Sequence, residues 1–219
     1  MASPELISSY CERRGPGPFD EPLNTITNLA FILAATHAWN LAARHRIHAG
    51  EIRLLILLSA TIGVGSAIFH ACPAPWTRLM DLVPILLFQL CFLWLYLRRC
   101  AGIRSITAAV LLSAYLVCSV LLSRAPPWLN GSVLYAPTIA AMAGLAAFHY
   151  CSGQPDRWLM AIAAVVFCAA LTFRTIDQIA CPYIPCGTHF LWHLLNGLVV
   201  SLAMRVMILT AIQRRLAQH

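Results

Sequence analysis

Long apolar runs alternate with short polar breaks along the whole chain. The runs hold about 20 residues and end at Arg, Pro, Gly or Asp, and a bilayer core about 30 Å thick needs roughly 20 apolar residues per helix. The pattern predicts an all-α polytopic membrane protein, a bundle of seven helices that span residues 24–43, 52–72, 79–97, 105–123, 131–150, 157–176 and 188–212. Because every connection is short, we expect one seven-helix membrane domain over residues 1–219.

The composition supports this class of protein. The chain is 60% hydrophobic and 11% charged, with a mean hydropathy of +0.74, which excludes an ordinary soluble domain. The segment 1–23 has no apolar core region, so we expect no cleavable signal peptide and a first membrane helix that serves as the signal. The charged residues of that segment are Glu5, Glu12, Arg13, Arg14, Asp20 and Glu21.

The arginines predict an orientation in the membrane. All 15 basic residues are arginine; alternate loops carry nine on one side and five on the other, and Arg205 lies inside the last span. By the positive-inside rule the richer side is cytoplasmic, so the N-terminus lies outside and the C-terminus in the cytoplasm. The net charge of +7 forms no basic stripe between aromatic residues, so we expect no nucleic-acid partner. Arginine in place of lysine and abundant alanine favour a bacterial source, hence an inner cell membrane.

Nine cysteines fall into three groups on this map. Those at the outer side can keep disulfides, so one or two are expected there with three pairings open: Cys11, Cys72, Cys181 and Cys186. The others lie within spans or near cytoplasmic ends: Cys91, Cys118, Cys168, Cys100 and Cys151.

Several ionisable residues are predicted to share one outer layer of the bundle. Ionisable side chains inside a membrane span are costly and indicate function. Two pairs are four residues apart and so share a helix face, and two aspartates flank them at the same depth. The set is Ser66, His70, Asp81, Asp177, His189 and His193.

Three neutral imidazoles with an open position are the ligand set of a catalytic zinc site. His70, His189 and His193 provide these imidazoles. Asp81 can orient a zinc-bound water or accept its proton, and Ser66 can hydrogen-bond a ligand or an oxyanion. On this interpretation His189 and His193 turn inward toward His70, with Trp192 at the membrane boundary.

Each residue also has a plain structural interpretation. A lone membrane histidine such as His70 can bond a backbone carbonyl, and HxxxH lacks the glutamate of the zincin motif HExxH. Ser66 follows Gly65, which suggests close helix packing, and Asp81 and Asp177 can be helix-end residues. Because all of these residues are predicted at one depth, a functional site is favoured over several separate structural roles. The remaining histidines lie outside this layer and are assigned no metal role: His37, His45, His48, His149 and His219.

The motifs also occur in the order found in one known family. YCERRGPGPFDEPLNTITNL, SAIFH, MDLVPI, TIDQIAC and GTHFLWH follow one another over about residues 10–200. In this order the chain resembles the alkaline ceramidases, members of the CREST superfamily of seven-helix membrane hydrolases. The resemblance implies zinc ligands, a serine beside the metal, an aspartate acting on the zinc water, and a disulfide from the N-terminal segment to the loop between the last two helices. The zinc ligands match His70, His189 and His193, the serine matches Ser66, and the aspartate matches Asp81. The two disulfide cysteines match Cys11 and Cys181.

One part of the family pattern is incomplete. Eukaryotic alkaline ceramidases bind calcium through an N-terminal acidic cluster, and Glu12 and Glu21 match it, whereas Ser9 and Arg14 stand where Asp and Asn are expected. Calcium takes six to eight oxygen ligands, and an arginine in that shell opposes it. The sequence therefore argues against a calcium site, and an ion pair from Arg14 to an acidic neighbour is the alternative.

The leading hypothesis is a zinc-dependent intramembrane hydrolase. It would cleave the amide bond of ceramide or a related N-acyl lipid, release a fatty acid and an amine such as a sphingoid base, and face the outer (periplasmic) leaflet. A lipid esterase of the same fold is an alternative, as is a CREST-type receptor or membrane protein with a structural zinc. Haem ligation by histidines is a third, which an absorption spectrum would test. The sequence leaves the natural lipid and the oligomeric state open.

Overall fold

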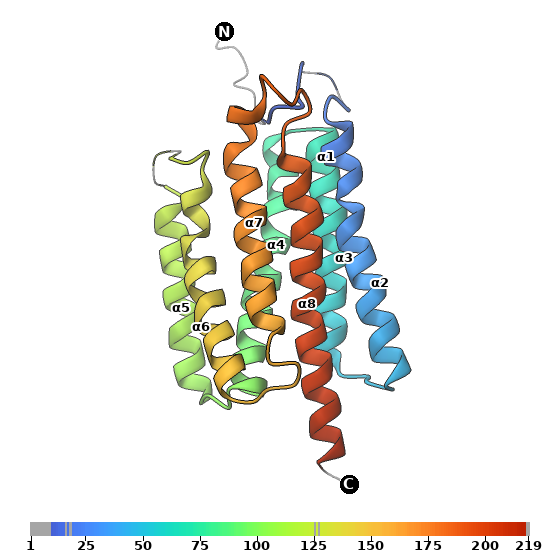
Figure 1. The fold of residues 1–219 in the computed structure, drawn as a ribbon, viewed down its shortest axis with the longest axis vertical. Helices are drawn as coiled ribbons and strands as arrows, with labels where there is room; N and C mark the ends of the chain where they lie inside the picture. The colour runs from blue at the N-terminus through green and yellow to red at the C-terminus, as the bar shows by residue number, and fades with distance from the viewer. Residues whose placement is uncertain (1–9, 16, 18, 125, 127, 218–219) are drawn as a thin grey trace.

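The structure is a computed structural model that describes residues 10–15, 17, 19–124, 126 and 128–217. Within these residues the chain forms helices and turns and no strand. The elements are α1 (Pro22–Thr27), α2 (Leu29–Arg44), α3 (Gly50–Ala71), α4 (Pro75–Leu95), the π-helical turn η1 (Tyr96–Cys100), α5 (Ser105–Leu122), the 3₁₀ turn η2 (Ser132–Tyr135), α6 (Ala136–Cys151), α7 (Leu159–Ala180) and α8 (His189–Leu216). Figure 1 shows long helices side by side along one axis, with α1 and the C-terminal end of α8 at opposite ends of the bundle.

The all-α multi-pass class is confirmed. In the part of the chain that the structure describes, six helices are long and apolar enough to cross a membrane: α3, α4 with η1, α5, η2 with α6, α7 and α8. The first predicted span, 24–43, divides at Asn28 into α1 and the 16-residue α2. Asn28 turns back on α1, where its Nδ2 donates to the carbonyl of Asn24 at 2.8 Å. The seventh span and the orientation remain predictions.

Several helix boundaries differ from the predicted ones, and two of these differences move a site residue. α4 begins at Pro75, because proline fixes φ and lacks the N–H that the first turn leaves unpaired. Asp81 therefore lies in the second turn rather than at the helix start. α7 continues to Ala180, so Asp177 lies inside its last turn instead of beyond its end.

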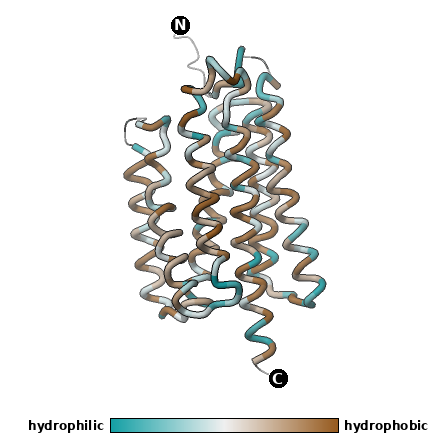
Figure 2. The backbone as a smooth tube through the Cα atoms, in the orientation of Figure 1, coloured by the Kyte–Doolittle hydropathy of each residue, from teal (hydrophilic) through white to brown (hydrophobic). Residues whose placement is uncertain are grey.

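The outer surface of the bundle is apolar, as expected for a protein surrounded by lipid. In Figure 2 hydrophobic residues cover the middle of the helices and polar residues gather at their ends. Many large apolar side chains are exposed on the helix faces, among them Leu57, Leu121 and Val165. α5 buries one residue, Ala108, so it lies almost entirely at the periphery.

The buried core forms around α8, which packs on α2 and α7, while α3 packs closely on α4. Two glycines permit the close approaches. A Cβ on Gly65 would lie 2.0 Å from the carbonyl oxygen of Met80 on α4. A Cβ on Gly197 would lie 2.6 Å from the Cβ of Ala30 on α2. These contacts fix how deeply α3 and α8 enter the bundle, and both helices carry the candidate histidines.

Candidate active site

Three histidines meet at the end of the bundle where α3 ends and α8 begins. His70 lies in the last turn of α3, and His189 and His193 lie in the first turns of α8. One ring nitrogen from each lies within 4.8 Å of the others, and all three side chains are buried. The ring centroids are 4.7 Å apart for His70 and His193, and 5.3 Å apart for His70 and His189. The structure thus brings together the three predicted ligands from positions more than 100 residues apart in sequence.

His70 is oriented by a buried carboxylate. Its Nδ1 lies 2.5 Å from Oε2 of Glu21, so Nδ1 carries the proton and donates to the carboxylate. Nε2 is then the nitrogen with a free lone pair, and it is buried without a hydrogen-bond partner among the described residues. A metal-binding histidine commonly donates its other ring N–H to a carboxylate in this way.

A threonine plays the same part for His193. The hydroxyl of Thr27 donates to the carbonyl of Leu23 at 2.7 Å, so its lone pair accepts the Nδ1 proton of His193 at 3.0 Å. Nε2 of His193 is therefore left with its lone pair. The third ring, His189, has a buried Nδ1 with no described partner. Two unsatisfied buried nitrogens beside a third lone pair fit a metal ion, because unpaired polar atoms in a dry interior are costly.

Ser66 and Asp81 lie in the same cavity as the three histidines. The cavity has a volume of about 420 Å³, and all five predicted residues line it. Ser66 is buried, and its hydroxyl is close enough to the carboxylate of Asp81 to interact with it. Gly65 explains the pairing, since its lack of a side chain lets α3 lie against the backbone of Met80, next to Asp81.

The two glutamates that match the calcium pattern bind protein donors. Glu12 accepts the backbone N–H groups of Leu23 at 2.7 Å and Asn24 at 2.8 Å, which satisfies the start of α1. Glu21 bonds Nε of Arg13 at 2.5 Å as well as His70. The ion pair that the sequence suggested for Arg14 is thus formed by Arg13, with Glu21. Ser9 lies outside the described residues.

Arg13 ties the N-terminal segment to the site. Its side chain is buried, and its Nη2 donates to the carbonyl of His70 at 3.0 Å. Nη1 donates to the carbonyls of Gly15 and Gly17 at 3.3 and 3.2 Å. The guanidinium therefore balances the charge of Glu21 and holds the end of α3 against the segment before α1.

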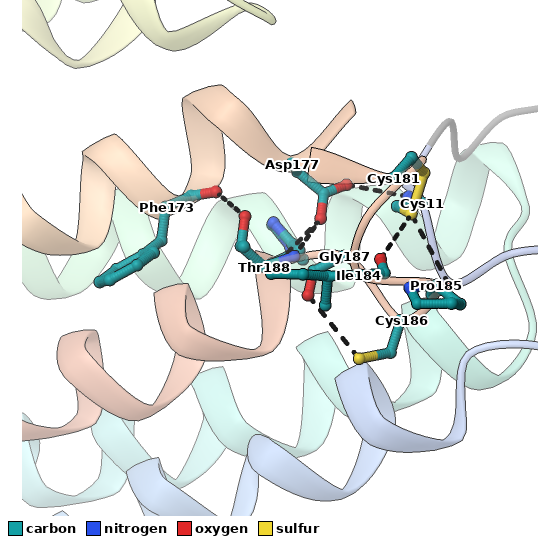
Figure 3. The surroundings of a disulfide bond; sticks show 10 residues. Cys11, Phe173, Asp177, Cys181, Ile184, Pro185, Cys186, Gly187 and Thr188 are labelled. Atoms are coloured by element: carbon teal, nitrogen blue, oxygen red, sulfur yellow. Dashed lines mark hydrogen bonds between the residues drawn. A yellow bond between two sulfur atoms is a disulfide. The ribbon is translucent and has the colours of Figure 1, made fainter. Parts of the chain in front are cut away.

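Asp177 organises the start of α8 rather than joining the histidines. Its Oδ1 accepts the N–H groups of Thr188 and His189 at 2.7 and 2.9 Å, and its Oδ2 accepts the N–H of Cys11 at 2.8 Å (Figure 3). Gly187 has φ +64°, and a Cβ there would lie 2.2 Å from Oδ1 of Asp177. This carboxylate accepts backbone N–H groups that would otherwise be unpaired at the start of α8, the helix that carries His189.

The disulfide implied by the family resemblance is confirmed. Cys11 is bonded to Cys181, across 170 residues of sequence, beside Asp177 (Figure 3). Cys72 and Cys186 are free. The bond anchors the N-terminal segment, where Tyr10 stacks on the ring of His189 at 3.7 Å between centroids. Burial raises the pKa of the Tyr10 phenol, so this ring is neutral.

Trp192 points into the bundle, and its predicted depth at the membrane boundary stays a prediction. The side chain is 7% exposed and packs on Tyr135 and Phe167, with ring centroids 4.9 and 5.9 Å away. Tryptophan is common at membrane boundaries, but here residue 192 lies on the same face of α8 as the histidines and so points inward. It lines the cavity wall.

Sequence reasoning missed the residues that support the histidines. Glu21, Arg13 and Thr27 precede α2, and no spacing rule connects them to His70 or His193, because the contacts cross 49 or more residues. The one indication in the sequence that these residues support the site was that polar side chains lie next to the apolar start of a membrane helix. His149, given no metal role, lies elsewhere, with its Nδ1 2.9 Å from the hydroxyl of Tyr96. His219 lies outside the described residues.

Comparisons with known proteins agree with this geometry. Searches of curated proteins and of solved structures return no match to this chain. A sequence model described as Ceramidase matches residues 19–219, which include every residue of the buried histidine cluster. Ceramidases hydrolyse the amide bond of ceramide, a reaction that suits a cavity among membrane helices whose histidines could hold a metal ion. The chain belongs to the ceramidase family.

Proposed function

We propose that this protein is a zinc-dependent intramembrane hydrolase that cleaves the amide bond of ceramide or a related N-acyl lipid, giving a free fatty acid and an amine. One observation carries the proposal: three buried histidines, two of them with an unsatisfied ring nitrogen, share a cavity with Asp81 and Ser66. Nitrogen ligands in this number suit zinc, whereas calcium and magnesium prefer oxygen. His70, His189 and His193 would hold the ion.

Bound zinc would polarise the amide carbonyl and lower the pKa of a water molecule. Asp81 would accept the proton of the attacking water and pass it to the leaving nitrogen, so that a C–O bond forms as the C–N bond breaks. The Ser66 hydroxyl would donate to the oxygen on which negative charge develops. Glu21 and Thr27 would keep the ligand rings in their metal-binding tautomers.

A second cavity provides room for an acyl chain. It lies among α4, α6, α7 and α8 and is lined almost wholly by apolar side chains, including Phe88, Leu145, Ala163 and Val200. Tyr135 and Trp192 line both this cavity and the one with the histidines. The acyl chain would therefore extend inward from the metal, with its carbonyl carbon near Asp81.

A third cavity suggests how a lipid enters from the bilayer. It lies between α4 and α5 and shares Leu82, Leu134 and Tyr135 with the cavity of the histidines. α5 lies at the periphery and buries one residue. We propose that a lipid enters laterally at this position, with the active site toward the outer leaflet, in a bacterial inner membrane.

Two substitutions test this function. Purified wild-type protein should contain one zinc per chain and release fatty acid from ceramide. His193→Ala should lose both the zinc and the activity. Asp81→Asn should keep the zinc but lower kcat about 10²- to 10⁴-fold, the size of a lost acid–base group.

The measurements are elemental analysis and mass spectrometry of products from a panel of lipid amides and esters. Asp81→Asn with full activity and zinc would indicate a structural metal in a receptor-like protein. Cleavage of esters alone would indicate a lipid esterase. Zinc-free wild-type protein that still releases fatty acid would contradict the proposal.

A further inference from the structure

The cavity of the histidines carries an excess of positive charge. Arg174 on α7 and Arg78 on α4 line it, and among the described lining residues Asp81 is the one carboxylate. The three histidines are neutral where they are arranged to bind a metal, and a divalent ion would add further positive charge. A cavity built for a substrate with no charge has no need of this excess.

Arg174 is held rigidly within the cavity wall. Its guanidinium carbon lies 5.3 Å from the ring centroid of Tyr135 and 5.9 Å from that of Trp192. Nη1 donates to the carbonyl of Asn130 at 2.7 Å and to the hydroxyl of Ser132 at 3.0 Å. No carboxylate of the described chain forms an ion pair with it. A guanidinium fixed in this way, half-buried between aromatic rings, presents a preorganised fork to a carboxylate or a phosphate.

The position of Arg174 identifies which part of a substrate it would contact. The side chain lines the polar cavity and is not among the residues that line the apolar one. It lies one turn before Asp177, at the end of α7 that meets the start of α8. An acyl chain in the apolar cavity would leave the amine part of the amide on the side of Arg174.

We infer that the substrates of this enzyme include N-acyl amides whose amine part carries an anionic group, a carboxylate or a phosphate, which Arg174 binds. Arg78 is exposed at the edge of the same cavity and adds attraction at longer range. The inference rests on the proposed amide hydrolysis, and it narrows the substrate class by the charge of the group attached to nitrogen.

The test compares matched pairs of lipids that differ in this charge. N-palmitoyl glycine and ceramide 1-phosphate are the anionic members, and N-palmitoyl ethanolamine and ceramide are the neutral ones. Wild-type protein should show a kcat/KM at least tenfold higher for an anionic member than for its neutral partner. Arg174→Gln should lower kcat/KM for the anionic lipids about 10- to 100-fold and leave the neutral lipids within about threefold, since a charge-assisted hydrogen bond contributes about 1.5–3 kcal/mol.

Arg174→Lys should restore part of the anion preference, because it keeps the charge without the planar fork. Arg124→Gln is the matched control: Arg124 is an exposed arginine just after α5 and is not a cavity residue. Preference for the carboxylate or for the phosphate identifies which anion the site selects.

Three results would overturn the inference. One is an equal loss on anionic and neutral lipids in Arg174→Gln, which would mean that Arg174 only positions the turn at Asn130 and Ser132. Another is no preference for charge in the wild type. The third is an Arg174→Gln variant that palmitate inhibits more weakly while KM is unchanged for all four lipids. That result would mean that the guanidinium binds the carboxylate of the fatty-acid product.

Ligand binding separates this inference from the proposed function. Thermal stabilisation of the protein by N-palmitoyl glycine, compared with N-palmitoyl ethanolamine, needs no turnover. Greater stabilisation by the anionic lipid, lost in Arg174→Gln, would support the anion site even if no amide were cleaved. Equal stabilisation by both lipids in a protein that does cleave amides would reject the anion site and leave the hydrolase intact.

Discussion

Each candidate ligand is held by a polar group from another part of the chain. Glu21 and Thr27 lie before α2, whereas Asp177 lies near the end of α7. The partners of the His70 and His193 rings fix the tautomer and orientation of each imidazole and raise its basicity, whereas Asp177 holds the backbone of His189. The affinity of the candidate site for a metal therefore depends on residues that would not bind the metal.

Glu21→Gln tests this dependence at one residue. An amide is a weaker acceptor for the Nδ1 proton of His70, so the Kd for zinc should rise about 10- to 100-fold. Zinc competition titrations with a chromophoric chelator measure it. Glu51→Gln is the control, because Glu51 pairs with Arg99 at 3.0 Å on the partly exposed side of α3.

Since Glu21 also balances the buried charge of Arg13, a folding readout must accompany that variant. Thr27→Val leaves this ion pair intact and removes the acceptor for His193, so its zinc affinity should also fall. Unchanged affinity in both variants would show that neither residue supports the ligands.

At the scale of elements, the pairing of α3 with α4 decides whether Ser66 meets Asp81. The two helices touch at Gly65, where the backbone of Met80 occupies the space that a side chain would need. The GSAIFH stretch is thus both a packing surface and part of the cavity wall. The interpretation of this region as a close-packing surface is confirmed, and the catalytic role of Ser66 stays a prediction.

Gly65→Ala should separate the two helices. A Cβ at 2.0 Å from a carbonyl oxygen cannot be accommodated by a side-chain movement, so we expect a loss of about 1–3 kcal/mol in stability and a fall in activity. Thermal unfolding in detergent and ceramide turnover measure the two effects.

Gly144→Ala is the matched control within α6, where an added Cβ meets nothing within 4 Å. It should leave stability unchanged or raise it by up to about 1 kcal/mol, the helix preference of alanine over glycine. Equal unfolding temperatures for the two variants would contradict the close-packing argument.

At the scale of the whole molecule, the described residues before α1 cover the end of the bundle that holds the histidines and join the first and last parts of the chain. The disulfide from Cys11 to Cys181, the bonds of Asp177 and the buried ion pair of Arg13 all act on this segment. Tyr10 covers His189 as a result. The same contacts therefore anchor this segment and position the residues around the candidate metal site.

Removing the disulfide should therefore weaken both stability and metal binding. The double variant Cys11→Ser with Cys181→Ser should lose up to about 4 kcal/mol, because the bond closes a very long loop. Its zinc affinity should fall as the ring of Tyr10 and the carboxylate of Glu21 lose their fixed positions.

Cys118→Ser, at an exposed free cysteine on α5, is the control and should change neither quantity. Unfolding temperature with and without reductant, together with zinc titration, measures both effects. A destabilised double variant with wild-type zinc affinity would show that the disulfide supports the fold alone.

The sequence by itself determined the class of the fold and predicted which histidines gather into the candidate site. Apolar runs of membrane length predict helices whatever their partners, since the backbone must satisfy its hydrogen bonds internally in lipid. The four-residue spacings of Ser66 with His70 and of His189 with His193 placed each pair on one face, because helical geometry is local.

The tertiary structure decided everything that depends on contacts between distant segments. It assigned Glu21 to His70 and Arg13, moved Asp81 into the second turn of α4, and turned Trp192 into the interior. Side-chain spacing carries no record of which helix lies opposite. Burial, charge pairing and the close approach at Gly65 are properties of the packed bundle, and they make a set of scattered polar residues into one site.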